Sequence, residues 1–286
     1  MRKKSSVRKL SGIVVMFLLG VHSALCLAGA KESVGQNWPA AKRVSIDRIN
    51  HAGWDGLLRK YVDSQGMVNY SVWHQSRQDR LALDQYLKHL SQADLHQPAS
   101  REAQLAYWIN AYNALTIEGI LRVYPTSSIR NHTAKVFGYN IWDDLLLTVG
   151  DRSFSLNQME HKVLRKMGDP RVHFAIVCAS IGCPPLLNQA YMAAQLDAQL
   201  TANASRFFAN PQKFRYDVSR RQLEVSPILQ WFAEDFGANQ AAQMRTIAKF
   251  LPDQAAQSLA ASGTASVRYL GYDWKLNDQA TQQRRR

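Results

Sequence analysis

The chain has 286 residues, of which 46% are hydrophobic, 20% charged and 10% aromatic. This much apolar and aromatic surface can fill a sizeable core, so the composition excludes an intrinsically disordered chain. With three cysteines, 15 glycines and nine prolines, it also excludes a disulfide-dense miniature scaffold and a collagen-like repeat. The formal net charge is +13.

The first thirty residues have the pattern of an export signal. Five basic residues at positions 2–9 precede an apolar stretch at 13–27, and small residues follow at 28–30. The apolar stretch is too short and poorly flanked for a stable membrane span. Residues 1–30 are therefore predicted to be a cleaved signal peptide. An uncleaved membrane helix and a lipid anchor at Cys26 are the weaker alternatives.

Export would place the mature protein in the periplasm or outside the cell. Loss of residues 1–30 removes five basic and no acidic residues and lowers the net charge from +13 to +8. The remaining charge favours peripheral contact with an anionic envelope surface, or is a solvated face, and no nucleic-acid partner is expected. We expect a linker at 31–46, one domain at 47–277 and a basic disordered tail at 278–286.

Three helices are predicted in the first half of the domain, at residues 54–61, 77–90 and 101–124. The third ends before Pro125, which removes a backbone donor. Because apolar residues occur on every side of this third helix, we expect it to lie at the centre of the core.

A hairpin is predicted next, with strands at 144–149 and 152–154 around a turn that begins with Gly150. Ser155 and Gln158 have the spacing of a capping box, which predicts that a helix starts there, and Gly168 has the residue type that ends one.

The second half is predicted to mix helices and strands. The apolar run at 172–178 indicates a strand buried on both faces. The other expected elements are a helix at 189–208, a hairpin of strands 213–217 and 222–226, helices at 228–236 and 240–250, and a strand at 267–270. Together these predict an α+β fold in which helices pack around a small mixed or antiparallel sheet, in a single domain. Trp231 and Phe232, like Tyr112, are expected in the core.

Several stretches resemble one protein family. They are AYWINAYNALT (106–116), EHKVLR (160–165), DPRVHFA (169–175), CAS (178–180), CPPL (183–186) and YDWKLN (272–277). These stretches closely resemble the family called domain of unknown function 547, over roughly residues 47–277. The resemblance implies a bacterial envelope setting for a chain with a signal peptide, and it implies no reaction.

Cys178 and Cys183 are the only cysteines left after export, and three interpretations of them stay open. In an oxidising compartment they can form a disulfide across a turn. Alternatively, Cys183 is a nucleophile, activated by its predicted place just before a long helix. The third interpretation is a zinc site with His161 and His173, although the spacing is unlike that of familiar structural zinc sites.

His173 and His161 are the two candidate bases. Strand alternation at 172–178 would put His173 and Cys178 on opposite faces, so His173 would reach Cys183 or be a hydrogen-bonded core residue. On a regular helix, Glu160 would face the core and His161 would flank it. A buried carboxylate needs polar partners, and we expect them in Asn110 or Asn113.

The leading hypothesis is a cysteine-dependent hydrolase or acyltransferase of the cell envelope. Cys183 would be the nucleophile, His161 or His173 the base, and Glu160 or Asn110 the residue that orients the base. No cofactor is expected. The alternative is a non-catalytic envelope binding or scaffold protein with a Cys178–Cys183 disulfide. No sequence feature assigns a substrate, a partner or an oligomeric state.

Overall fold

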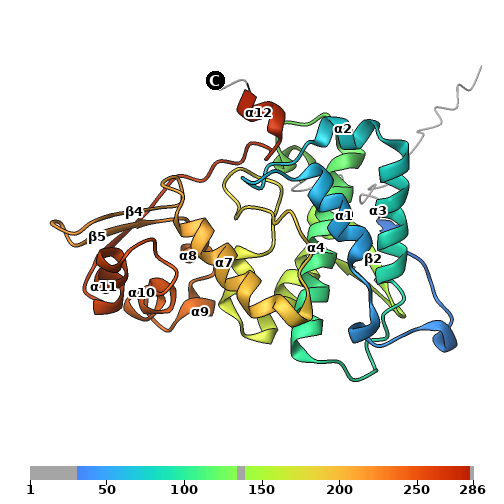
Figure 1. Cartoon of the computed structure of the whole chain (residues 1–286), viewed down its shortest axis with the longest axis horizontal. Helices are drawn as coiled ribbons and strands as arrows, with labels where there is room; N and C mark the ends of the chain where they lie inside the picture. Colours follow the sequence, from blue (N-terminus) through green and yellow to red (C-terminus); the bar gives the residue numbers. More distant parts are fainter. Residues whose placement is uncertain (1–30, 134–138, 284–286) are drawn as a thin grey trace, which may run out of the picture.

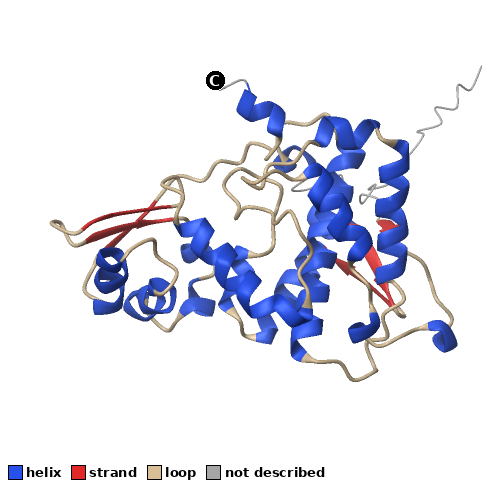
Figure 2. Ribbon diagram, viewed as in Figure 1, coloured by secondary structure: helices blue, strands red, loops and turns tan. Residues whose placement is uncertain are grey.

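The computed structural model describes residues 31–133 and 139–283. The predicted signal peptide with its cleavage site and the three terminal arginines lie outside the described residues. Helices and two small sheets form one domain (Figures 1 and 2). The α+β prediction is therefore confirmed, with two sheets where one was expected.

Helices provide most of the described structure. The α-helices are α1 (Ala52–Tyr61), α2 (Tyr70–Gln75), α3 (Arg77–Leu90), α4 (Arg101–Val123), α5 (Ile141–Asp144), α6 (Leu156–Gln158), α7 (Leu196–Phe208), α8 (Ile228–Trp231), α9 (Ala233–Phe236), α10 (Gln240–Ala248), α11 (Gln254–Ser262) and α12 (Gln279–Gln283). Of these, α2, α5, α11 and α12 were not predicted, and α7 begins seven residues later than expected.

Each sheet has three strands. The first contains β1 (Glu32–Val34), β2 (Leu145–Val149) and β3 (Arg152–Ser155). The second contains β4 (Phe214–Asp217), β5 (Gln222–Val225) and β6 (Ser266–Tyr269). Each sheet combines one antiparallel hairpin with one parallel pair. Both predicted hairpins are confirmed, and Gly150 has the positive φ of 62° that its turn requires.

The long helix α4 lies at the centre of the larger core, as predicted. The hydroxyl of Ser100 caps its first turn by accepting a hydrogen bond from the Ala103 amide. Side chains from 103 to 121 are almost all buried, and α2, α3 and β2 pack around them. A second core forms around α7, the second sheet and α10. Tyr272 packs against both cores.

The predicted buried strand at 172–178 is wrong. The segment begins with a 3₁₀ turn, Pro170–Phe174, and continues as irregular backbone. Side-chain amides make the backbone hydrogen bonds that a neighbouring strand would have made. Asn113 donates to the Ala175 carbonyl at 3.0 Å and accepts from the Val177 amide at 2.9 Å. Because these backbone groups are satisfied inside the core, an apolar run of strand length needs no sheet.

Both ends of the predicted domain extend further than expected. β1, which lies in the predicted linker, pairs with β2. Residues 279–283 of the predicted disordered tail form α12, and the side chain of Gln279 donates to the carbonyls of Tyr61 and Met67. Within residues 31–133 and 139–283, none of the helices is both long enough and apolar enough to cross a bilayer.

Candidate functional site

A cavity of about 250 Å³ brings most of the predicted site residues together. Cys183, Cys178, Glu160, His161 and His173 all line it. The remaining lining residues are mainly aromatic or apolar: Tyr112, Trp142, Asn157, Ile176, Pro184, Ile228, Trp231, Phe232, Tyr272 and Trp274. Residues from six separate stretches of sequence therefore meet at one place.

The sulfur of Cys183 is surrounded by hydrogen-bond donors. The backbone amide of Cys178 donates to it at 3.0 Å, and the hydroxyl of Ser180 donates at 3.3 Å. The Tyr272 hydroxyl lies 3.2 Å away and the Cys178 sulfur 2.7 Å away. A thiolate accepts such bonds better than a thiol does, so this arrangement favours the charged form of Cys183.

The two cysteines differ in acidity. Burial alone would raise the pKa of Cys183, but hydrogen bonds from Cys178, Ser180 and Tyr272 together outweigh burial and lower it below its ordinary value. The pKa of Cys178 moves upward, because its thiol donates to Cys183 and because it is buried. Cys183 is thus the thiolate of the pair.

The predicted cause of this acidity was wrong. Cys183 does not begin a helix, because 12 residues separate it from Leu196, where α7 starts. Hydrogen bonds from nearby amide, hydroxyl and thiol donors lower the pKa of Cys183, an effect that was expected from a helix dipole.

Glu160 reaches the cavity from an unusual turn. Met159–Leu164 is a π-helix, which winds more widely than the regular helix assumed from the sequence. The carboxylate accepts a hydrogen bond from the Tyr112 hydroxyl at 3.2 Å. Neither Asn110 nor Asn113 bonds to Glu160, so the partners expected from the sequence were wrong.

The acidity of Glu160 suits proton transfer near neutral pH. Burial raises its pKa to about 7, the Tyr112 hydrogen bond lowers it, and the charge of a Cys183 thiolate raises it further. A carboxyl group with this pKa exchanges a proton readily under physiological conditions.

His173 is locked into a buried network. Its Nε2 lies 2.7 Å from Oδ2 of Asp235, and its ring stacks on Phe232 with centroids 4.1 Å apart. Asp235 also accepts from Nε of Arg165 at 2.6 Å. Burial lowers the pKa of His173 to about 4 despite the opposing effect of Asp235. The imidazole is therefore neutral at pH 7.

The pKa of His161 is also lowered. Arg165 donates to Nδ1 of His161 at 3.0 Å. Burial, and then the charge of Arg165, lower the pKa of His161. Neither histidine shares a described hydrogen bond with Cys183.

Asn110 does not line the cavity. Its amide donates to the Tyr191 carbonyl at 2.8 Å, and its carbonyl accepts from the Tyr191 amide at 2.9 Å. The side chain thus pins the loop before α7. This is the backbone-bridging role that was the alternative to a site role.

An aromatic rim borders the cavity, and sequence reasoning missed it. Trp231 was expected in the core, yet 48% of its surface is exposed. Its ring stacks with Trp274 at 5.8 Å and meets Tyr272 at 4.8 Å. Tyr272 and Trp274 belong to the closing YDWKLN stretch, which was the available signal for them. Nothing in the sequence pattern singled out Asp235.

The structure also bears on the other two interpretations of the cysteines, a disulfide and a zinc site. Both thiols are free, and their sulfurs are further apart than the ~2.05 Å of a disulfide bond. The described residues include no group of three or more histidine, cysteine or acidic side chains placed to hold a metal ion.

Comparison with known proteins gives the family and no reaction. Residues 96–208 match the family described as "Protein of unknown function, DUF547". No curated protein and no solved structure matches the chain. The matched segment contains both cysteines, both candidate histidines and Glu160. The family resemblance is therefore established for residues 96–208.

Proposed function

We propose that this protein is a cysteine-dependent hydrolase or acyltransferase with Cys183 as its nucleophile. The observation that carries the proposal is the pairing of a donor-surrounded sulfur with a carboxyl group of pKa about 7 in one cavity. A nucleophile needs its charge at neutral pH, and a proton-transfer group needs a pKa near neutral. Cys183 and Glu160 meet these two needs.

In the proposed first step, the Cys183 thiolate attacks the carbonyl carbon of an ester, thioester or amide. A carbon–sulfur bond forms, and the bond to the leaving group breaks. The protonated Glu160 gives its proton to the leaving group. The product is an acyl thioester on Cys183 and a carboxylate on Glu160.

In the second step, water or another acceptor attacks this thioester. Glu160 takes the proton of the attacking group, the carbon–sulfur bond breaks, and the Cys183 thiolate returns. Acylation removes the thiolate charge that raises the pKa of Glu160. The carboxylate form is therefore favoured when a base is needed.

Glu160 replaces the histidines in the role that the sequence first suggested for them. A general base of pKa near 4, such as His173, is weak at pH 7. We assign His173 to positioning, through Asp235 on one side and Phe232 on the other.

One observation favours the alternative, a structural Cys178–Cys183 disulfide in an envelope binding or scaffold protein. The two sulfurs lie only 2.7 Å apart, so a disulfide needs little movement. A thiol assay separates the two proposals.

The assay uses full-length protein purified without reductant and treated with iodoacetamide between pH 5.5 and 9. Peptide mass mapping should find Cys183 alkylated first, with a midpoint below the ordinary thiol pKa of ~8.5. In Cys178→Ala the midpoint should rise because the thiol that donates to Cys183 is lost. Alkylation only after added reductant would support the disulfide, and slow, equal labelling of both thiols would refute the nucleophile.

We also propose that the protein acts in the cell envelope after export. The support is the basic start, apolar stretch and small-residue site of residues 1–30. Amino-terminal sequencing of protein from an envelope extract should begin at or near Lys31. Intact Met1 in a soluble cytoplasmic fraction would contradict export.

A further inference from the structure

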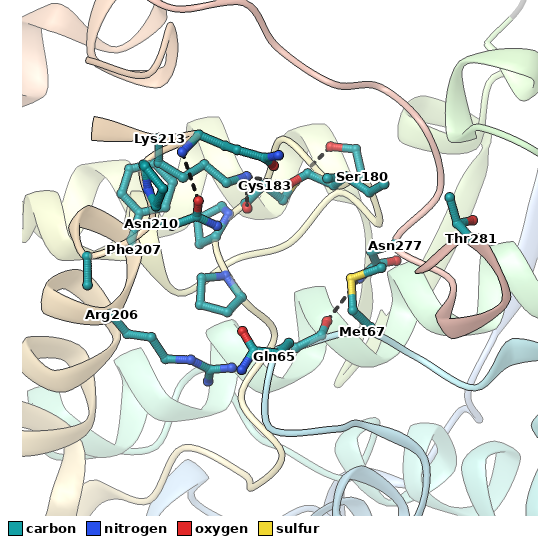
Figure 3. Close-up of a pocket in the computed structure, with 17 residues that line it drawn as sticks. Gln65, Met67, Ser180, Cys183, Arg206, Phe207, Asn210, Lys213, Asn277 and Thr281 are labelled. Atoms are coloured by element: carbon teal, nitrogen blue, oxygen red, sulfur yellow. Dashed lines mark hydrogen bonds between the residues drawn. The ribbon is translucent and has the colours of Figure 1, made fainter. Parts of the chain in front are cut away.

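A second, larger cavity of about 550 Å³ lies next to the cysteine loop. It shares Cys183 and Pro184 with the first cavity and is otherwise lined by different residues. Figure 3 shows its labelled side chains around an open space, with Arg206 extending toward Gln65, and with Lys213 and Asn210 along another wall. The acyl-transfer mechanism uses none of these four residues.

Two cations line this second cavity, Arg206 and Lys213, and none of its 17 described lining residues carries a carboxylate. Cys183, the acidic thiol, lines the cavity where it meets the first one. Main-chain carbonyls are the described hydrogen-bond acceptors for both cations. Arg206 donates to Ser64, and Lys213 donates to Ile181 and, at 2.8 Å, to Cys183.

Burial disfavours the charged form of both cations. Lys213 is only 5% exposed, and burial lowers its pKa to about 8 although the nearby charges of Cys183 and Asp273 act in the opposite direction. Arg206 is half-buried, and burial lowers its pKa although the charge of Asp63 acts in the opposite direction. Arg171 shows the contrast, since hydrogen bonds from its guanidinium to Asp169 raise its pKa. A bound anion would offset the cost that burial imposes on the two cations of the cavity.

We propose that this cavity binds a small molecule through an oxyanion group, either a carboxylate or a phosphate. Arg206 supplies a planar fork of donors that matches both groups. Gln65 and Asn210 add amide donors, and Lys213 adds positive charge from the wall. Phe207 and Pro185 offer apolar surface to the rest of the molecule. This site is separate from the proposed reaction and does not depend on it.

The test measures binding by calorimetry and thermal shift at constant ionic strength. The probes are inorganic phosphate and succinate, with chloride as the reference anion. The parent protein should bind at least one probe saturably, and the preferred probe identifies the oxyanion. Arg206→Gln should weaken that binding by about tenfold or more, because a charged hydrogen bond is lost.

Two variants make the result specific. Arg220→Gln removes an exposed cation from the β4–β5 turn and should leave binding within about twofold. Glu160→Gln alters the first cavity alone and should also retain binding, which separates this site from the acyl-transfer proposal. Gln65→Ala provides a second test should Arg206→Gln fail to fold. No saturable binding, parent-like binding by both cavity variants, or equal weakening by Arg220→Gln would overturn the proposal.

Discussion

Glu160 and Asp235 lie in the same neighbourhood but in opposite electrostatic states. Asp235 accepts hydrogen bonds from Arg165 and His173, which outweigh burial and lower its pKa. Glu160 has the neutral hydroxyl of Tyr112 as its hydrogen-bond donor, so burial dominates and raises its pKa to about 7. Their charges differ because Arg165 is bonded to one carboxylate and not to the other.

This comparison indicates different uses for the two carboxylates. Asp235 is a fixed anion that holds Arg165 and His173 in place. Glu160 is free to gain and lose a proton beside Cys183. The position of one guanidinium thus separates a positioning residue from a proton-transfer residue.

The largest expected effect tests Glu160 as the base. With p-nitrophenyl acetate, acetylation of Cys183 needs no acid because the leaving group is already good, whereas hydrolysis of the thioester needs a base. Glu160→Gln should slow that hydrolysis by about 10²- to 10⁴-fold. Acetylated Cys183 should then accumulate by intact-protein mass spectrometry. Asp235→Asn is the matched control and should accumulate little adduct. Parent-like turnover by Glu160→Gln would contradict the assignment.

The next prediction concerns the free energy of unfolding. Removing the charge should raise it at Glu160 and lower it at Asp235. The folded pKa of Glu160 lies above its ordinary value of 4.5, so stability is lost as pH rises from 4.5 to 7. Glu160→Gln should therefore gain about 3 kcal/mol at pH 8 and little at pH 4. Urea unfolding at both pH values measures this gain.

Asp235→Asn should lower stability at neutral pH. Because the folded pKa of Asp235 is lowered, its contribution is present above the unfolded value and fades as pH falls. The loss at pH 7 should be about 2 kcal/mol, from hydrogen bonds to Arg165 and His173. The same sign of change in Glu160→Gln and Asp235→Asn at pH 8 would remove the distinction between them.

A comparable effect should appear on the acid side through His173. Its folded pKa of about 4 lies below the ordinary 6.5, so the unfolded chain binds a proton first and stability falls as pH drops below 6.5. The loss at pH 5 is about 2 kcal/mol. His173→Gln should reduce the fall in the free energy of unfolding between pH 7 and pH 5, measured by denaturant unfolding. An unchanged fall would show that another group causes the loss of stability in acid.

The smallest effect concerns the aromatic rim. Trp231 is half-exposed, so Trp231→Ala should change stability by less than about 1 kcal/mol. If the rim binds rings, this variant should acylate more slowly with a phenylacetyl ester than the parent, by about two- to tenfold. The rate of acylation by an acetyl ester should stay the same. An equal decrease in the acylation rate with both esters would argue against binding of a ring by Trp231.

Much of the fold was predictable because its signals are local. Ser155 and Gln158 form the predicted capping box, and Gly168 ends the segment with a φ of 72°. The β2–β3 turn at Gly150 follows from residue types two positions apart. The apolar run at 172–178 failed as a strand because its partners, such as Asn113, lie some sixty residues away in sequence.

The site was predictable in composition and unpredictable in arrangement. Four of the five predicted site residues line the cavity, whereas Asn110 holds the backbone of Tyr191. The sequence could not choose between His173 and Glu160 for proton transfer. That choice depends on Arg165 and Asp235, which are 70 residues apart in sequence.

The sequence by itself determined most of the longer helices, both hairpins, the resemblance of residues 96–208 to a known family and the residue types available in the cavity. Those features depend on neighbours within a few positions, or on recognisable motifs. The tertiary structure decided which thiol is acidic, which carboxyl holds a proton near pH 7 and which cavity collects positive charge. These properties depend on burial and on hydrogen bonds between distant segments, because the free energy of a charge is set by everything that surrounds it in the folded chain.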